Sequence, residues 1–114
     1  MSRQYVQIDR RQFDEMSAAD TTGELDPWRA TADELHAGFR LSSFSAAATF
    51  AAAIAVIADQ LDHHPDLDVR FPGIVRVVVS THVTGGLTLA DVETARAVSR
   101  LAGAMGANGE QSAA

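Results

Sequence analysis

The chain of 114 residues contains no cysteine and no lysine. Without cysteine, disulfide bonds, thiolate catalysis and cysteine-based zinc sites are excluded. The nine basic residues are all arginine and form no dense run, and the net charge is −6. Because an acidic surface repels nucleic acid and anionic lipid, we expect neither a nucleic acid nor a membrane as a partner.

Long hydrophobic runs are also missing. The longest nearly apolar stretch, residues 46–58, falls short of the roughly 20 residues that a membrane-spanning helix needs. Residues 1–16 carry charges throughout and lack the apolar centre of a signal peptide. A chain of this length with 46% hydrophobic residues suits one compact domain with a single core. We therefore expect a cytoplasmic protein.

Hydrophobic periodicity predicts an α+β fold. We expect a four-stranded antiparallel sheet with helices packed on one face, in the order α-β-β-α-β-β-α. The helices are predicted at residues 10–19, 42–61 and 88–105, and the strands at residues 28–31, 35–41, 68–71 and 74–81. We divide the chain into an N-terminal segment (1–26), a domain (27–106) and a frayed tail (107–114).

Local signals mark several element ends. Ser43 or Ser45 is the expected N-cap of helix 42–61. Thr88, followed three residues later by Asp91, resembles a capping box. The dipeptide at residues 72–73, Pro-Gly, is typical of a type II turn between two strands.

One face of helix 42–61 is alanine-rich, and two interpretations of it remain open. Alanine is the best helix former, so the composition alone explains a stable helix. Alternatively, a flat alanine face lets a second subunit approach closely.

Three of the four histidines lie in residues 59–91. His63 and His64 follow a predicted helix, and His82 ends a predicted strand, so a hairpin-like return would bring His82 back to the pair. Singly, each has a structural explanation, as a helix C-terminus or a loop residue. Together they allow a metal site of Asp59, His63 and His82, although no specific zinc signature is present. They equally allow metal-free proton transfer between imidazoles, with a carboxylate such as Asp59, four residues before His63, orienting one ring.

The spaced motif around these histidines resembles that of the pterin-4a-carbinolamine dehydratases. The resemblance covers residues 28–101 and leaves residues 1–26 unmatched. The residues that stand at motif positions are Asp59, His63, His64, Pro65, Phe71, His82 and Asp91.

The resemblance implies a hydro-lyase that converts 4a-hydroxytetrahydropterin to quinonoid dihydropterin without metal or cofactor, in a homodimer or homotetramer. It implies a catalytic set of His63, His64, His82 and Asp59. The implied substrate-binding set is Asp62, Pro65, Phe71, Ser80, Thr81, Val83 and Asp91. Imidazoles with a pKa near ~6.5 can hold one acid and one base at neutral pH, and we take His63 and His82 as that pair.

The sequence departs from the family pattern in the spacing after Phe71 and in the residue types at Asp59, Leu67 and Val83, and an alternative function remains open. The spacing from Phe71 to His82 is one residue longer than usual, which predicts a β-bulge or a longer turn at residues 72–73. The alternative is a non-catalytic binding module of the same fold, a dimerisation cofactor or an assembly chaperone. The presence of all three histidines favours the enzyme.

Overall fold

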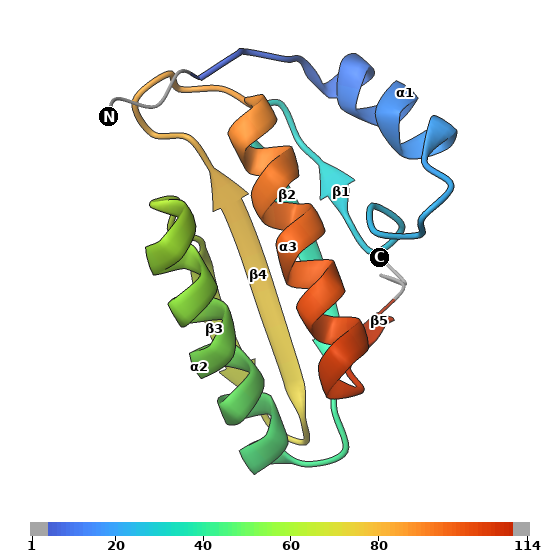
Figure 1. The fold of residues 1–114 in the computed structure, drawn as a ribbon, viewed down its shortest axis with the longest axis vertical. Coiled ribbons are helices and arrows are strands. Elements are labelled where there is room, and N and C mark those ends of the chain that lie inside the picture. Colours follow the sequence, from blue (N-terminus) through green and yellow to red (C-terminus); the bar gives the residue numbers. More distant parts are fainter. Residues whose placement is uncertain (1–4, 111–114) are drawn as a thin grey trace.

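An antiparallel sheet of five strands carries helices on one face in the computed structural model, which describes residues 5–110 (Figure 1). The elements are α1 (Arg10–Ala19), β1 (Arg29–Ala30), β2 (Glu34–Arg40), α2 (Phe44–Leu61), β3 (Asp66–Arg70), β4 (Ile74–Ser80), α3 (Leu89–Met105) and β5 (Asn108–Glu110). β2 and β4 pair at the centre, β3 lies at one edge, and β1 and β5 share the other side of β2. The predicted α+β class and the order of its first seven elements are confirmed.

The caps explain where the helices begin. Asp9 and Gln12 form a reciprocal capping box at α1, which occupies the residues predicted for it. Ser43, rather than Ser45, caps α2, because its hydroxyl accepts a hydrogen bond from the Ala46 N–H at 3.0 Å.

The core lies between the sheet and the helices. Alternate residues of β2 and β4 point toward α2 and α3, and Phe39 of β2 packs edge-on against Phe50 of α2, with ring centroids 5.5 Å apart. Phe13 and Leu25, from the N-terminal segment, are buried in the same cluster. The segment of residues 1–26 therefore contributes to this core.

The C-terminal end differs from the expected frayed tail. Residues 108–110 form β5, which pairs with β2 so that Gly38 lies opposite Glu110, and Arg40 forms an ion pair with Glu110 at 3.2 Å. The sheet therefore has five strands instead of four. Residues 111–114 lie outside the described residues.

The turn between β3 and β4 also differs from expectation. The pairing runs without a bulge from Asp66↔Val78 to Arg70↔Ile74, so residues 71–73 form a longer turn. Gly73 does not have the positive φ that a type II turn requires, so that prediction was wrong. Glycine is needed at this position because a Cβ would lie 2.7 Å from the Leu41 carbonyl oxygen.

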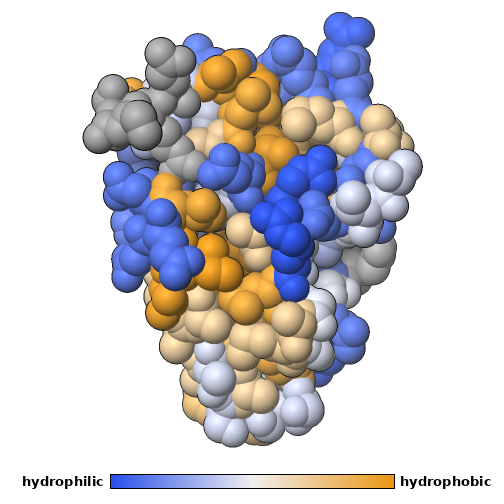
Figure 2. Space-filling model, viewed as in Figure 1, coloured by the Kyte–Doolittle hydropathy of each residue, from blue (hydrophilic) through white to orange (hydrophobic). Residues whose placement is uncertain are grey.

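By length and composition, α2 resembles a membrane-spanning helix, with a mean hydropathy of 1.6 over 18 residues. Core helices of soluble proteins pass the same test, and α2 packs on β3 and β4. Only 28% of its residues are buried, however. Figure 2 shows hydrophobic and neutral colours over the lower, N-terminal part of this helix. The exposed apolar side chains include Phe44 (50%) and Val56 (57%).

Candidate active site

At the end of α2, the chain reverses direction and points the His63 side chain toward the protein interior. Asp62 adopts the left-handed conformation with φ 52°, which ends the helix, and the His63 N–H then bonds the Ala58 carbonyl at 3.1 Å. Asp is one of the few residues besides glycine that visits this conformation routinely. The reversal leaves Asp62 exposed and the His63 side chain only 6% exposed.

His63 belongs to a buried hydrogen-bond network that joins three elements at the upper end of Figure 1. Its Nε2 lies 2.7 Å from Oδ1 of Asp91, which is 0% exposed at the start of α3. Thr81, just after β4, donates to the same Oδ1 at 3.0 Å, and its hydroxyl lies 2.9 Å from that of Thr88. The other carboxylate oxygen accepts the Thr88 backbone N–H at 2.9 Å. Asp91 therefore caps α3, as predicted, and also binds His63.

The network determines which nitrogen of His63 carries a proton. Because Oδ1 of the Asp91 carboxylate is an acceptor, Nε2 of His63 must donate, and Nδ1 then holds the lone pair of the neutral ring. A carboxylate at a helix N-terminus is favoured by the helix dipole. A proton taken up at Nδ1 would create an imidazolium facing this carboxylate. The pair therefore contains the two groups, an imidazole and a carboxylate, that a proton acceptor of this kind needs.

Asp59 and His64 form a separate pair at the surface. Oδ1 of Asp59 lies 3.0 Å from Nε2 of His64, and the two side chains are 77% and 58% exposed. Asp59 was expected to orient a ring, with His63 four residues on as its partner. It pairs with His64 instead, because the turn at Asp62 directs His63 inward.

His82 directly follows Thr81, whose hydroxyl lies 3.4 Å from Nε2 of His63. The His82 side chain is exposed and makes no hydrogen bond or ion pair within residues 5–110. Ser80 and Pro65, which neighbour network residues in the sequence, are partly buried, and Val83 is 84% exposed.

Phe71 is not brought to this end of the sheet. It lies in the turn that joins β3 to β4, at the opposite end of β4 from Thr81 (Figure 1). Seven residues of extended strand separate the two ends, which is about 23 Å at roughly 3.3 Å per residue. Phe71 is 82% exposed there. Within one chain it is too distant to contact a ligand held by His63.

The metal arrangement of Asp59, His63 and His82 does not form. Across residues 5–110, no three His, Asp or Glu side chains are grouped as metal ligands. Asp59 bonds His64, and His63 bonds Asp91.

Tyr5 lies beside His63, a contact that sequence reasoning missed. Its ring centroid lies 6.0 Å from that of His63, with the planes tilted by 43°. Residues 5–8 reach this position as an extended arm, because Gln7 pairs with Thr88 in an isolated bridge. No motif marks this tyrosine, and only the pairing of the arm with a residue far along the chain reveals it.

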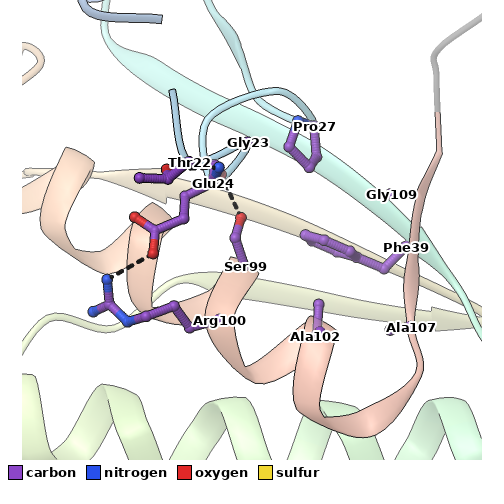
Figure 3. Close-up of a pocket in the computed structure, with 11 residues that line it drawn as sticks. Thr22, Gly23, Glu24, Pro27, Phe39, Ser99, Arg100, Ala102, Ala107 and Gly109 are labelled. Atoms are coloured by element: carbon purple, nitrogen blue, oxygen red, sulfur yellow. Dashed lines mark hydrogen bonds and ion pairs between the residues drawn. The ribbon is translucent and has the colours of Figure 1, made fainter. Parts of the chain in front are cut away.

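A cavity of about 340 Å³ opens at the other end of the helix layer, beside the C-terminal half of α3 (Figure 3). Phe39, Pro27 and small residues line it, and Glu24 and Arg100 form an ion pair of 3.2 Å at its rim. None of the predicted site residues contributes to its lining. It is therefore separate from the histidine network.

An ionic cluster beside this cavity holds residues 20–26 against α3. Arg96 contacts Asp20 at 3.1 Å and Glu24 at 3.0 Å. The Thr22 hydroxyl, together with Arg96 and two backbone N–H groups, holds the pKa of Asp20 well below its usual range. Hydrogen bonds from Arg96 and then Arg100 lower the pKa of Glu24. Both carboxylates are therefore stabilised in the charged form.

Comparison with known proteins agrees with this architecture. A provisionally named pterin-4-alpha-carbinolamine dehydratase from Chloroflexus aurantiacus is 35% identical over 89 residues, covering 78% of this chain and 95% of that protein. Another, from Bordetella avium, is 34% identical over 111 residues, covering 96% and 94%. The crystal structure of a transcriptional coactivator/pterin dehydratase from Brucella melitensis superposes with a TM-score of 0.71 at 28% identity, covering 84% and 98%.

The family model described as pterin 4 alpha carbinolamine dehydratase matches residues 11–101. The match begins well before Trp28, so most of α1 also belongs to the family pattern, in contrast to the expectation for residues 1–26. The chain is therefore a member of the pterin 4 alpha carbinolamine dehydratase family.

Proposed function

We propose that this protein dehydrates 4a-hydroxytetrahydropterin to quinonoid dihydropterin by histidine acid/base catalysis, without a metal or cofactor. The observation that carries the proposal is the buried pair of His63 and Asp91, 2.7 Å apart, in a chain of this family. A buried, oriented imidazole with a carboxylate partner is a typical proton-transfer group.

The reaction requires two proton transfers. The C4a–O bond breaks as the departing hydroxyl is protonated to water, and the N5–H bond breaks as its electron pair forms the C4a=N5 double bond. Nδ1 of His63 takes the N5 proton, and Asp91 stabilises the resulting imidazolium. His82, exposed and unpaired within the described chain, supplies the proton to the leaving hydroxyl. Each transfer contributes roughly 10²- to 10⁴-fold in rate.

Apart from Phe71, the remaining predicted residues belong to the segments that end at the same edge of the sheet as this pair. The surface pair of His64 and Asp59 assists binding at the rim, and Asp62, Pro65, Ser80 and Val83 flank it in the chain. Thr81 positions Asp91 through its 3.0 Å hydrogen bond. The pterin is a substrate in this proposal.

A dehydratase assay on synthetic carbinolamine tests the function directly. Wild-type protein should accelerate dehydration over buffer, and the His63→Ala and His82→Ala variants should lose most of that acceleration. Wild-type protein that performs no better than buffer would exclude the enzyme.

We also propose that a second copy of the chain covers the exposed face of α2, giving a homo-oligomer. The helix carries no charged residue between Phe44 and Ala58, although the whole chain has a net charge of −6. Two copies repel each other least through such an uncharged face, and burying Phe44 and Val56 adds favourable apolar contact. A binding-module role in the alternative hypothesis would use this same face. Sedimentation analysis of the native protein tests the oligomer.

A further inference from the structure

We propose that Tyr5 forms one wall of the pterin site and stacks against the substrate ring. This inference rests on the proposed dehydratase function, because it assigns a binding residue to the same site. The motif around the histidines contains no part of residues 1–8, so Tyr5 enters only through the folded arrangement.

The arm that carries Tyr5 is attached to the helix end that carries Asp91. The Ile8 N–H bonds the Leu87 carbonyl at 2.9 Å, and the Val6 carbonyl accepts the Leu89 N–H at 2.9 Å. Leu89 is the first residue of α3, so its N–H has no partner within the helix, and the arm satisfies it. The arm is thereby held in register with Asp91, and Asp91 holds His63.

The side chains of the arm fall into two groups, exposed and partly buried. Val6 is 54% exposed and Gln7 is exposed, whereas Ile8 packs against the core. Tyr5 is partly buried, with its ring 6.0 Å from that of His63. The arm therefore presents an aromatic ring beside the proposed proton acceptor, with part of the ring left accessible.

The chemistry of the Tyr5 side chain suits a flat heterocycle. Aromatic rings bind flat conjugated rings through offset or tilted stacking, at centroid distances of roughly 4.5–7 Å. Within residues 5–110 the Tyr5 hydroxyl makes no hydrogen bond. We expect it to bond a polar edge of the ligand. The quinonoid product and 7,8-dihydropterin offer both a flat pyrimidine ring and such an edge, and in the substrate only C4a departs from that plane.

Two substitutions separate the ring from the hydroxyl. Tyr5→Leu removes the ring, and Tyr5→Phe keeps it. The matched control is Val6→Ala, on the same arm but with its side chain directed to solvent. Each variant is measured for kcat and KM on synthetic carbinolamine, for Kd of 7,8-dihydropterin by calorimetric titration, and for thermal midpoint.

We expect Tyr5→Leu to raise both KM and Kd about tenfold, as the loss of one stacking partner does, with kcat nearly unchanged. Tyr5→Phe should restore most of the binding, and Val6→Ala should match wild type. If Tyr5→Leu leaves KM and Kd unchanged or lowers them, Tyr5 is not a binding wall, although the dehydratase function stands. A fall in kcat alone would also overturn the proposal, because Tyr5 would then act through His63.

The dihydropterin titration keeps the two proposals distinguishable. If the wild-type protein has no dehydratase activity, the proposed function fails. A tenfold weaker Kd for Tyr5→Leu than for wild type would still support the binding wall. Equal Kd values, or no binding by either protein, would overturn it as well.

Discussion

Asp91 lies 2.7 Å from His63 across 28 residues of sequence, and both side chains are buried. The same carboxylate accepts the Thr88 N–H and caps α3. The beginning of α3 and the orientation of His63 therefore depend on one group. A substitution at residue 91 should affect both the stability of the fold and the proposed chemistry.

Replacing Asp91 with asparagine should lower kcat about 10²-fold and destabilise the protein by about 1–3 kcal/mol. Both carboxylate oxygens accept N–H donors, whereas an amide offers one acceptor, so one buried donor loses its partner. Urea unfolding and steady-state kinetics measure the two effects. By contrast, Asp59→Asn should change activity by about fivefold at most, because an exposed ion pair contributes little. Equal losses in the two variants would contradict this assignment.

His82→Ala should separate activity from stability. The side chain is exposed and unpaired within the described chain, so the free energy of unfolding should change by less than about 0.5 kcal/mol. If His82 supplies the proton to the leaving hydroxyl, kcat should fall by about 10²-fold or more. Denaturant unfolding and the carbinolamine assay are compared for the same preparation. Full activity in a folded His82→Ala protein would remove this residue from the mechanism.

The ionic cluster of Asp20, Glu24 and Arg96 should make the free energy of unfolding fall at acidic pH. The folded state lowers the pKa of both carboxylates, so their contribution is fully present above the ordinary values of 3.8 and 4.5. It is lost as the pH falls below those values toward the folded-state pKa. Thermal midpoints from pH 7 to pH 2 should decline more gently for Arg96→Gln, which starts from a lower stability. Parallel curves for the two proteins would show that the cluster is not responsible.

Two glycine substitutions should have opposite effects on stability. Gly73→Ala places a Cβ 2.7 Å from the Leu41 carbonyl oxygen, a backbone atom, and should destabilise the fold by about 1–3 kcal/mol. Gly103→Ala, inside α3 with open space around it, should stabilise it by about 0.5–1 kcal/mol. Urea midpoints measure both. Destabilisation by Gly103→Ala would mean that this helix surface is covered in solution.

Val56→Glu should weaken self-association through α2. The side chain is 57% exposed in the single chain, and in the proposed oligomer it would place like charges in an uncharged interface. Sedimentation equilibrium should show a shift toward the 12.1 kDa monomer. Ala18→Glu, exposed on α1, is the matched control and should leave the mass unchanged. A native protein that is already monomeric would reject the oligomer.

Contiguous residues were sufficient to predict the helices and the central strands. The stripe of Phe50 and Ile54 marks α2, and Ser43, Thr88 and Asp91 mark helix starts, because capping and periodicity act within a few residues. The spaced motif also grouped His63 with Asp91, and the two side chains contact each other in the folded chain.

The tertiary structure decided what those residues do. β5 has the sequence Asn-Gly-Glu, which has little strand propensity, and it is a strand because β2 offers an unpaired edge. After the left-handed turn at Asp62, His63 bonds Asp91, and Asp59 bonds His64. The N-terminal arm places Tyr5 beside the His63 imidazole. Local propensity is a property of neighbouring residues in the chain, whereas the β2–β5 pairing and the contacts of His63 with Asp91 and Tyr5 join distant segments and form only when the whole core packs.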